Sequence, residues 1–305
     1  MMNNRNELQG EKDLLVVRQV KKKWKDFALK NISFTLPEGY ILGLIGKNGA
    51  GKSTLMNCII GCIDCDGEIV VDGKQNTQHM RAASQNIGFI VEDGPFLKKE
   101  TLLKNGEIFG DLYDLWNEEK FHKLLAEFGL HYDMEYGELS KGMETKFQLA
   151  FALAHSPRLL ILDEPTGGLD PVFRKSFLTI LQNIVSKEML SVIISTHLTT
   201  DLDKVPDYVM LLDEGEMVFY EDKEKLLDNY PLVSGTVDLL EEIPKSAYRR
   251  VQKKGNLFHT IFTDKNYLQK HAQLIEKVQI ERTNLEDIMY YLSAPSIRLL
   301  GEEIV

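Results

Sequence analysis

A glycine-rich segment, GKNGAGKS from Gly46 to Ser53, lies between an apolar run and a stretch with helical periodicity. It fits the pattern G-x-x-x-x-G-K-[ST], in which glycines let backbone N–H groups turn inward around phosphate oxygens at the start of the following helix. Lys52 can reach the β- and γ-phosphates of a nucleotide, and the Ser53 hydroxyl can bind Mg²⁺. Because the segment joins a strand to a helix, we prefer a phosphate site to the alternative of a glycine-rich connection without a ligand.

Two adjacent carboxylates, Asp163 and Glu164, follow an aliphatic run in RLLILDEPTGGLD. Acids at a strand end are usually helix caps or solvated turns, but a phosphate loop in the same chain favours a role in phosphoryl transfer. We assign Asp163 to the metal ion, directly or through water, and Glu164 to orienting and deprotonating an attacking water. The sequence therefore predicts both halves of a phosphoryl-transfer site.

Another acidic position lies in IGFIVEDGPF, where an apolar run stops at Glu92 and Asp93. Asp93, Gly94 and Pro95 are residues that tight turns favour, so we expect them to form a turn. Glu92 is either the polar end of a strand or a residue placed for chemistry, and this stretch alone leaves both interpretations open.

Hydrophobic periodicity divides the chain into alternating strands and helices. We expect strands within 14–45, a helix over 52–61, a mostly helical insertion over about 97–157, and buried strands in RLLILD, SVIIST and YVMLLD. Near-continuous aliphatic runs of this kind are typical of a parallel sheet covered on both faces. The predicted fold class is α/β: a P-loop NTPase core with a mostly parallel sheet, an antiparallel β-subdomain and a helical subdomain.

The pattern changes near residue 220, which divides the chain into a predicted nucleotide-binding domain at 1–220 and an accessory α+β domain at 221–305. Short strands are expected in NLFHTIFTD and KVQIER, and a helix in TNLEDIMYYL. We expect that helix to open with a capping box between Thr283 and Glu286.

Composition limits the classes of function that remain. The 305 residues are 43% hydrophobic and 27% charged, as in an ordinary folded protein of about two domains. The formal net charge of −10 argues against a nucleic-acid-binding surface, and the basic stretches KKKWK and KSAYRRVQKK are interpreted as solvated faces. No apolar run approaches the ~18 residues needed to span a bilayer, and the polar start carries no signal-peptide pattern. We therefore expect a cytosolic protein whose membrane role, if any, requires a partner.

Three cysteines, Cys58, Cys62 and Cys65, lie close together in NCIIGCIDCDG. A structural zinc site needs four ligands, and no fourth ligand lies nearby in the sequence. We interpret the cysteines as small buried hydrophobic residues on and after one helix, in a reducing compartment.

Taken in order, these motifs resemble the ATP-binding subunit of an ABC transporter over about residues 14–220. The loop that ends at Lys52 looks like the Walker A motif, and Asp163 and Glu164 look like the end of the Walker B strand. GGLD is similar to the D-loop, ELSKGMETK takes the place of the signature motif, and SVIISTH ends in what looks like the switch histidine. The resemblance implies these site residues: catalytic Lys52, Glu164 and His197; nucleotide-binding Trp24, Gly46, Asn48, Gly49, Gly51, Lys52, Ser53, Thr54, Ser140, Gly142 and Asp170; metal-binding Ser53, Glu92 and Asp163.

Two of these assignments depend on the resemblance most strongly. Trp24 looks like the aromatic residue that stacks on adenine, and its alternative is a half-buried tryptophan of a strand. His197 alone would be an ordinary histidine at a strand end. In the family, the switch histidine contacts the γ-phosphate and holds the attacking water together with the general base, here Glu164.

The signature segment predicts a second anion site. Ser140 and Gly142 precede a helix that starts near Met143, so a hydroxyl, a backbone N–H and a helix N-terminus point the same way. The resemblance implies that this site faces the ATP held by another subunit, so that an isologous homodimer sandwiches two ATP molecules and opens on hydrolysis. Lys141 and Met143 depart from the common LSGGQ pattern, but Ser140 and Gly142 remain, so we expect competent sites.

Glu92 stands where the family usually has the glutamine of the Q-loop. This departure is similar to the glutamate variant in ATPases of Gram-positive exporters for bacitracin, lantibiotics and other antimicrobial peptides, and LSKGM fits the same group. The resemblance implies an ATP- and Mg²⁺-dependent motor subunit at the cytoplasmic face of the plasma membrane. It would dock to a separate transmembrane permease beside Glu92 and export an antimicrobial or amphipathic peptide. The accessory domain could regulate the ATPase, stabilise the dimer or contact the permease.

The alternative function is that of a soluble ABC ATPase acting on ribosomes or DNA. Twin-cassette translation factors have two phosphate loops, whereas this chain has one, and repair and chromosome ATPases usually contain long coiled coils that are absent from this sequence. The acidic charge also opposes nucleic-acid binding. An ATPase of an importer is a third possibility, which the Glu92 variant disfavours.

Overall fold

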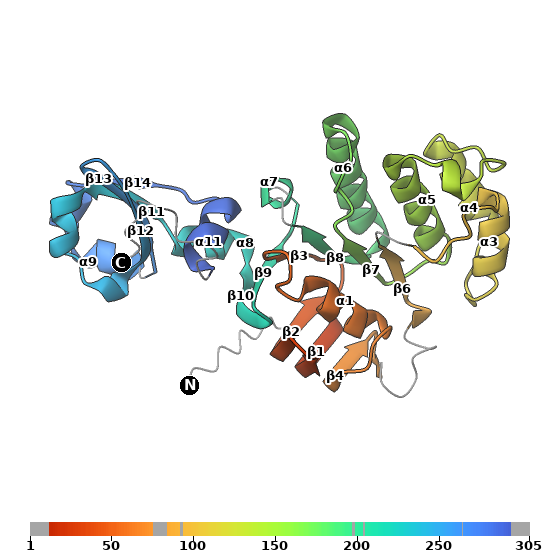
Figure 1. The fold of residues 1–305 in the computed structure, drawn as a ribbon, viewed down its shortest axis with the longest axis horizontal. Coiled ribbons are helices and arrows are strands. Elements are labelled where there is room, and N and C mark those ends of the chain that lie inside the picture. Colours follow the sequence, from red (N-terminus) through yellow and green to blue (C-terminus); the bar gives the residue numbers. More distant parts are fainter. Residues whose placement is uncertain are drawn as a thin grey trace.

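The computed structural model describes residues 12–75, 84–91, 94–196, 199–203, 205–263 and 265–293. The predicted site residues Glu92 and His197 lie outside these ranges. Figure 1 shows a central body of two sheets, with a helical unit at one end and a small unit of sheet and helices at the other.

The central sheet has the strand order β10-β9-β3-β8-β7-β6. Its strands are β3 (Ile41–Ile45), β6 (Ile87–Ile90), β7 (Leu159–Asp163), β8 (Ser191–Thr196), β9 (Tyr208–Asp213) and β10 (Glu216–Asp222). All neighbours pair in parallel except β10, which pairs with β9 in antiparallel fashion at the edge. Every residue of β3 and β8 is buried, as a parallel sheet covered on both faces requires. The predicted α/β class is confirmed.

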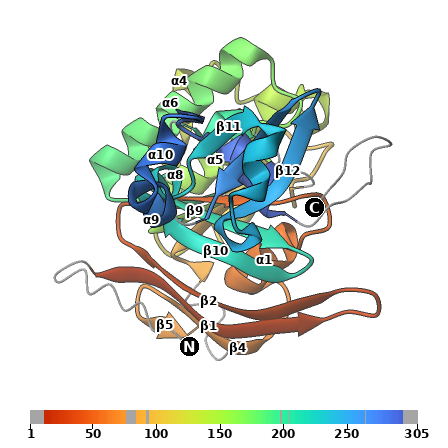
Figure 2. The same cartoon turned by 90° about the vertical axis from the view of Figure 1, so that its left-hand side faces the viewer.

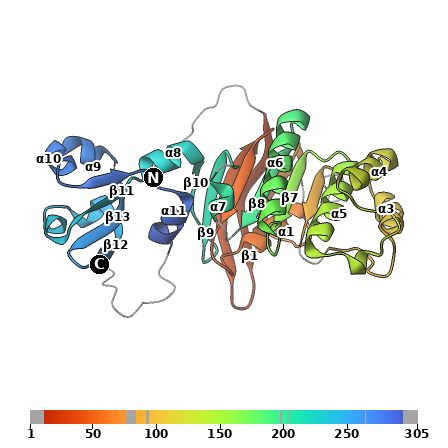
Figure 3. The ribbon, with the colours of Figure 1, turned by 90° about the horizontal axis from the view of Figure 1, so that it is seen from above.

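A second, antiparallel sheet has the order β2-β1-β4-β5. It consists of β1 (Asp13–Lys23), β2 (Ala28–Pro37), β4 (Asp66–Val71) and β5 (Lys74–Gln75). Helix α1 (Lys52–Ile60) lies between this sheet and the central sheet (Figure 1). Figure 3 shows the same body from above. Both sheets and α1 contribute to one apolar core, whose buried members include Leu15, Leu36, Leu44, Leu55, Ile59 and Ile161.

The cysteines next to this core differ from one another. Cys58 is buried on α1, and burial raises the pKa of its thiol to about 12. Cys65 is partly buried, but Cys62 is exposed, so the expectation that all three are buried is wrong for Cys62. Helix α1 ends at Ile60 with Gly61 in a left-handed conformation, and Cys62 therefore lies in the exposed turn that follows.

The other face of the central sheet is covered by α5 (Lys141–Ala154), α6 (Pro171–Glu188) and the short α7 (Thr199–Leu202). Asp170 caps α6 by accepting hydrogen bonds from the backbone of Val172 and Phe173, and Pro171 occupies the first turn. Phe177 and Leu181 of α6 are buried in the core on this face. The sheet is thus enclosed by helices on both sides.

The helical unit contains α3 (Leu102–Gly110), α4 (Glu118–Glu127), the 3₁₀ turn η1 (Tyr136–Glu138) and most of α5. Its helices start at side-chain caps, with Thr101, Asn117 and Ser140 accepting backbone hydrogen bonds. Its own core is aromatic, and the edge-to-face rings pack around Phe96 and Phe147. These elements all fall within the insertion expected at 97–157.

Beyond β10, helix α8 (Lys223–Asn229) still packs on the central body, and a third sheet begins at Leu232. This sheet has the order β12-β13-β11-β14, from β11 (Leu232–Thr236), β12 (Tyr248–Lys254), β13 (Leu257–Phe262) and β14 (Gln279–Glu281). Figure 2 faces this accessory unit, which also contains η2 (Val237–Glu241), η3 (Lys245–Ala247), α9 (Lys265–Lys270), α10 (Ala272–Ile275) and α11 (Leu285–Leu292). The division of the chain near residue 220 stays a prediction.

The N-terminal cap of α11 differs from the predicted capping box. The capping residue is Asn284 and not Thr283. The Asn284 side chain accepts a hydrogen bond from the backbone N–H of Asp287 at 2.8 Å. The Thr283 hydroxyl donates instead to the carbonyl of Tyr230, at the end of α8. A tertiary hydrogen bond of a buried residue thus replaces the local cap, and asparagine serves equally well at this position.

Gly106 of α3 provides a test of the packing in the helical unit. A Cβ atom at this position would lie 2.3 Å from Cε1 of Phe121, which is 1% exposed. Alanine has a helix propensity better than glycine by about 1 kcal/mol, but overpacking a buried ring costs about 1–3 kcal/mol. We expect Gly106→Ala to lower the midpoint of urea unfolding, whereas Asn183→Ala, at an exposed position of α6, leaves it unchanged or raises it slightly. A midpoint raised by Gly106→Ala would contradict this packing.

Candidate functional site

The phosphate loop joins β3 to α1, and its geometry requires glycine at two points. Gly46 has φ +154°, and a Cβ atom there would lie 2.3 Å from the backbone oxygen of Leu212 in β9. Gly51 has φ +107°, and its Cβ atom would lie 2.7 Å from the ring of Phe27. Gly46 is therefore explained by its close approach to the backbone of β9, and Gly51 by its positive φ and its contact with the Phe27 ring.

Lys52, the first residue of α1, folds back over the loop. Its Nζ atom donates hydrogen bonds to the carbonyl oxygens of Gly46, at 2.7 Å, and Lys47, at 3.3 Å. The residue is only 6% exposed, and Nζ lies 3.7 Å from Oε1 of Glu164. Burial lowers the pKa of the Lys52 ammonium, while the carboxylates of Glu164 and Asp163 act in the opposite direction. The site thus holds a buried cation whose compensating charge comes from two acids.

Ser195 of β8, which was not predicted from the sequence as a site residue, holds the two acids together. Its hydroxyl donates to Oδ1 of Asp163 at 2.6 Å and accepts the backbone N–H of Glu164 at 3.0 Å. Ser195 pairs with Asp163 in the register of β7 and β8 and is fully buried. A hydroxyl within the aliphatic run SVIIST was the available signal, but only the strand register shows what it contacts.

Glu164 itself has φ +47°, a left-handed conformation that is uncommon for a residue with a side chain. The chain therefore turns sharply just after β7, and the hydrogen bond to Ser195 holds this turn. As a result, the carboxylates of two adjacent residues both reach the same cavity.

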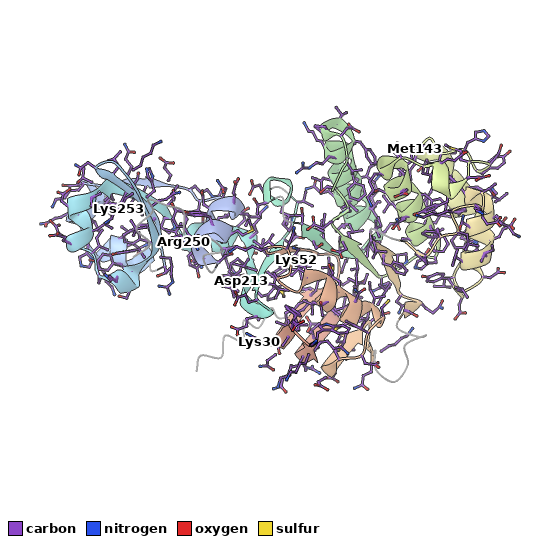
Figure 4. The ribbon with its side chains drawn as sticks, in the orientation of Figure 1. Lys30, Lys52, Met143, Asp213, Arg250 and Lys253 are labelled. Carbon is purple, nitrogen blue, oxygen red and sulfur yellow. The ribbon has the colours of Figure 1, made fainter. Side chains whose placement is uncertain are left out.

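That cavity, of about 440 Å³, unites most of the predicted nucleotide-binding residues. Trp24 lies just after β1 at its edge, 47% exposed, with the ammonium of Lys22 5.1 Å from the centre of its ring. Figure 4 shows Lys52 in the central body. The residues that line the cavity are Trp24, Phe27, Lys47, Asn48, Gly49, Gly51, Lys52, Ser53, Thr54, Asp163 and Glu164.

Four predicted nucleotide-binding residues do not line this cavity: Gly46, which lies at the base of the loop and accepts the hydrogen bond of Lys52, and Ser140, Gly142 and Asp170. Ser140 caps α5, with its hydroxyl 3.4 Å from the backbone nitrogen of Met143, and Asp170 caps α6. A Cβ atom at Gly142 would meet the side chains of Phe173 and Leu169 at 3.5 and 3.6 Å, so the first turns of α5 and α6 are neighbours. In Figure 4, Met143 lies well away from Lys52. The predicted site residues therefore form two separate groups within one chain.

Gln148 of α5 is a second residue that was not predicted from the sequence, and it is only 3% exposed. Its Oε1 accepts the backbone N–H of Val91 at 3.0 Å, and its Nε2 donates to the hydroxyl of Tyr136 at 3.3 Å. A Cβ atom at Gly94 would lie 3.2 Å from the same Nε2. The chain on either side of Glu92 and Asp93 thus contacts the helix that the signature segment begins.

The described residues fit a nucleoside triphosphate with a divalent cation. Gly49 borders open space, since a Cβ atom built on this residue would meet no other atom within 4 Å. The exposed Ser53 and the carboxylate of Asp163 line the same cavity and are oxygen ligands of the kind that Mg²⁺ prefers. Trp24 offers a ring at the cavity edge, large enough to cover a base.

Comparisons with known proteins agree with this geometry. A model of the ABC transporter family matches residues 29–167. The chain is 31% identical over 220 residues to the lantibiotic transport ATP-binding protein SrtF of Streptococcus pyogenes, covering 70% of this chain and 94% of SrtF. It is 35% identical over 202 residues to the methionine import ATP-binding protein MetN of Protochlamydia amoebophila, covering 63% of this chain and 59% of MetN. It is 30% identical over 198 residues to the bacitracin transport ATP-binding protein BcrA of Bacillus licheniformis, covering 63% of each.

The chain thus spans less than two thirds of MetN and BcrA but nearly all of SrtF. Among solved structures, an ATP-binding subunit of an ABC transporter superimposes with a TM-score of 0.65 at 26% identity, over 70% of this chain and 92% of that one. Sequence, fold and the cavity around Lys52 therefore agree. The chain belongs to the family of ABC transporter ATP-binding proteins, whose shared domain binds and hydrolyses ATP.

Proposed function

We propose that this protein is the ATP-hydrolysing motor subunit of a bacterial ABC exporter. The observation that carries the proposal is the convergence of Lys52, Asp163 and Glu164 on one cavity at the phosphate loop. A buried cation for the phosphates, an acid for the metal ion and a second acid for water are the parts that phosphoryl transfer requires.

In this proposal, the loop from Gly46 to Thr54 surrounds the triphosphate of ATP, and Trp24 covers the adenine. Ser53 and Asp163 hold Mg²⁺, which would neutralise charge on the β- and γ-phosphates. Glu164 orients the attacking water and accepts its proton. The roles of His197 at the γ-phosphate and of Glu92 at the metal ion stay predictions, because both residues lie outside the described ranges.

The separation of the two groups of site residues supports a dimer. Ser140, Gly142 and Asp170 lie away from the cavity of their own chain, whereas the N-terminus of α5 offers anion-binding N–H groups. A second copy related by a two-fold axis would bring its α5 to this cavity and close ATP between the subunits. Hydrolysis would then separate them again.

The helical unit offers a surface for the permease. A groove between α3 and α4 combines apolar residues, Leu103, Ile108, Trp116 and Phe121, with charged ones, Lys104, Glu107, Asp111 and Glu118. Leu97, Ile108, Leu112 and Leu115 are exposed nearby in the chain. Exposed apolar side chains next to a groove are typical of a protein–protein contact.

Among the described residues, no helix is both long and apolar enough to span a bilayer. In this proposal, the subunit lies at the cytoplasmic face of the membrane and is held there by its permease.

The direction of transport and the cargo rest on relatives. SrtF, a lantibiotic transport protein, is covered over 94% of its length, and BcrA is a bacitracin transport protein, whereas MetN is an import protein. Together with Glu92 in the Q-loop position, this supports export of an antimicrobial or amphipathic peptide. A soluble ABC ATPase on ribosomes or DNA is the alternative, which the net charge of −10 opposes.

Glu164→Gln tests the assigned base. The neutral amide keeps the shape of the side chain but cannot accept a proton, so we expect ATP binding to persist while steady-state hydrolysis falls roughly 100-fold or more. ATP should then hold the variant as a dimer, which light scattering after size-exclusion chromatography detects with and without Mg-ATP. Hydrolysis at the wild-type rate would contradict the role of Glu164.

Ser195→Ala tests the contact that joins the acids. It removes a 2.6 Å hydrogen bond to Asp163 and the acceptor for the N–H of Glu164, a loss of about 1.5–3 kcal/mol for a bond to a charged group. We expect kcat to fall about tenfold and the Mg²⁺ concentration for half-maximal activity to rise. Ser191→Ala is the matched control, since Ser191 is equally buried on β8 but bonds Gly39 and Pro37. Equal effects of the two variants would show that only the packing of β8 matters.

Affinity capture from gently solubilised membranes tests the partner. We expect a polytopic membrane protein to co-purify and mass spectrometry to identify it. The reconstituted complex should show ATPase activity that candidate peptides stimulate. Capture of ribosomes or DNA in place of a membrane protein would favour the alternative function.

A further inference from the structure

The turn that joins β9 to β10 lies against the phosphate loop. Glu214 and Gly215 form a two-residue connection, since Asp213 pairs with Glu216 across the hairpin, and both turn residues have a positive φ. The backbone N–H of Gly215 donates to the carbonyl of Ala50, within the phosphate loop, at 3.0 Å. Both residues are buried, so this hydrogen bond supports the loop from the protein interior.

The same turn also contacts β2, in the antiparallel sheet. The carbonyl of Gly215 accepts the backbone N–H of Lys30 at 2.7 Å, and the Lys30 ammonium forms an ion pair with Glu216 at 2.8 Å. Further along the strands, the hydroxyl of Tyr220 donates to the carbonyl of Thr35. Figures 1 and 2 show β10 between β9 and β2, and Figure 4 shows Lys30 in this part of the central body. The two sheets are therefore joined at this turn.

Gly215 leaves no room for a side chain between the turn and β2. Its φ is +77°, and a Cβ atom there would lie 1.9 Å from the backbone oxygen of Ala28, the first residue of β2. Because the obstacle is backbone and not the end of a flexible side chain, an added methyl group displaces either the turn or the start of β2. Gly215 thus sets the gap between β2 and the phosphate loop.

This gap has a counterpart inside the nucleotide cavity. Phe27 directly precedes β2, and its ring is the group that a Cβ atom at Gly51 would meet at 2.7 Å. The backbone N–H of Trp24 donates to the carbonyl of Phe27 at 2.7 Å, which closes the turn between β1 and β2. Trp24 and Phe27 both line the cavity together with the phosphate loop. The position of β2 relative to the loop therefore decides how far the Trp24 ring lies from the phosphates of a bound nucleotide.

We propose that Gly215 is a positioning residue for the nucleotide: by spacing β2 from the phosphate loop, it lets one ATP molecule reach the loop and the Trp24 ring at the same time. This inference rests on the proposed function, in which Trp24 covers the adenine. Gly215 does not line the cavity and acts through Ala50 and the start of β2. A ligand that spans both parts depends on this spacing, whereas a ligand that contacts the loop alone does not.

The test compares Gly215→Ala with Gly73→Ala. Gly73 is the second residue of the two-residue turn between β4 and β5, with φ +75°, and a Cβ atom there would meet nothing within 4 Å. The two substitutions therefore introduce similar backbone strain, but only Gly215→Ala displaces a neighbour. Titration calorimetry with Mg²⁺ uses two probes: a non-hydrolysable ATP analogue, which spans the cavity, and inorganic tripolyphosphate, which contacts the loop alone.

For Gly215→Ala we expect the Kd of the ATP analogue to rise at least tenfold, with the Kd of tripolyphosphate within twofold of the wild-type value. The KM for ATP should rise in the same proportion with kcat within twofold, because Asp163 and Ser195 belong to β7 and β8. Gly73→Ala should leave all four values unchanged. Equal losses for the two probes, no loss for either, or equal effects of the two variants would overturn the inference.

Hydrogen exchange gives a readout that does not depend on the nucleotide. The Lys30 amide, which donates to Gly215, should exchange faster in Gly215→Ala than in Gly73→Ala. If circular dichroism shows Gly215→Ala to be unfolded, the double variant Lys30→Ala/Tyr220→Phe releases side-chain contacts between β2 and β10 without adding an atom. It should raise the Kd of the ATP analogue at least twofold and leave that of tripolyphosphate unchanged, and an unchanged Kd for the analogue would overturn the inference.

Failure of the proposed function gives a different result. Equal affinity of the wild type for the two probes would refute the role of Trp24 at the adenine. Exchange of the Lys30 amide would still decide whether Gly215 holds β2 in place.

Discussion

The parallel register of β3, β7 and β8 is the constraint on which the site depends. Parallel strands end at the same edge of a sheet, so the loop after β3 and the acids after β7 meet there with Ser195 of β8. Asp163 lies directly opposite Ser195, and the hydroxyl between them ties both acids to the neighbouring strand. The carboxylate of Glu164 lies 3.7 Å from the Lys52 ammonium because the phosphate loop and the turn after β7 are at the same edge of the sheet.

Around this edge, the chain is built from bodies with separate apolar cores. The helical unit has an aromatic core around Phe96, and the accessory sheet has its own core around Phe258. Such bodies move relative to one another more readily than a single core deforms. Specific contacts join them: α5 packs on the central sheet and Gln148 holds the end of β6, while α8 and α11 pack the accessory side against α7 and its neighbours.

Much of this organisation could be predicted from the sequence, because it depends on local patterns. Aliphatic runs identified the parallel strands, and the phosphate loop lies between a strand and a helix as its pattern demands. What could not be predicted depends on tertiary neighbours. The hydrogen bonds of Ser195 and Gln148 depend on strand register and on helix packing. Thr283 does not cap α11, because its hydroxyl donates to the carbonyl of Tyr230. Cys62 was expected to be buried, but it is exposed in the turn after α1.

The burial of α11 also has a consequence for the order in which the protein is completed during synthesis. Leu202, Val205 and Leu226 emerge from the ribosome well before Ile288, which covers them in the finished chain. At ordinary elongation rates this delay is on the order of ten seconds, during which an apolar surface of the central body is exposed to water and to other nascent chains. The central body is thus completed by a helix that is made after the rest of the apolar cluster, so this face stays open to non-native contacts until α11 has been synthesised.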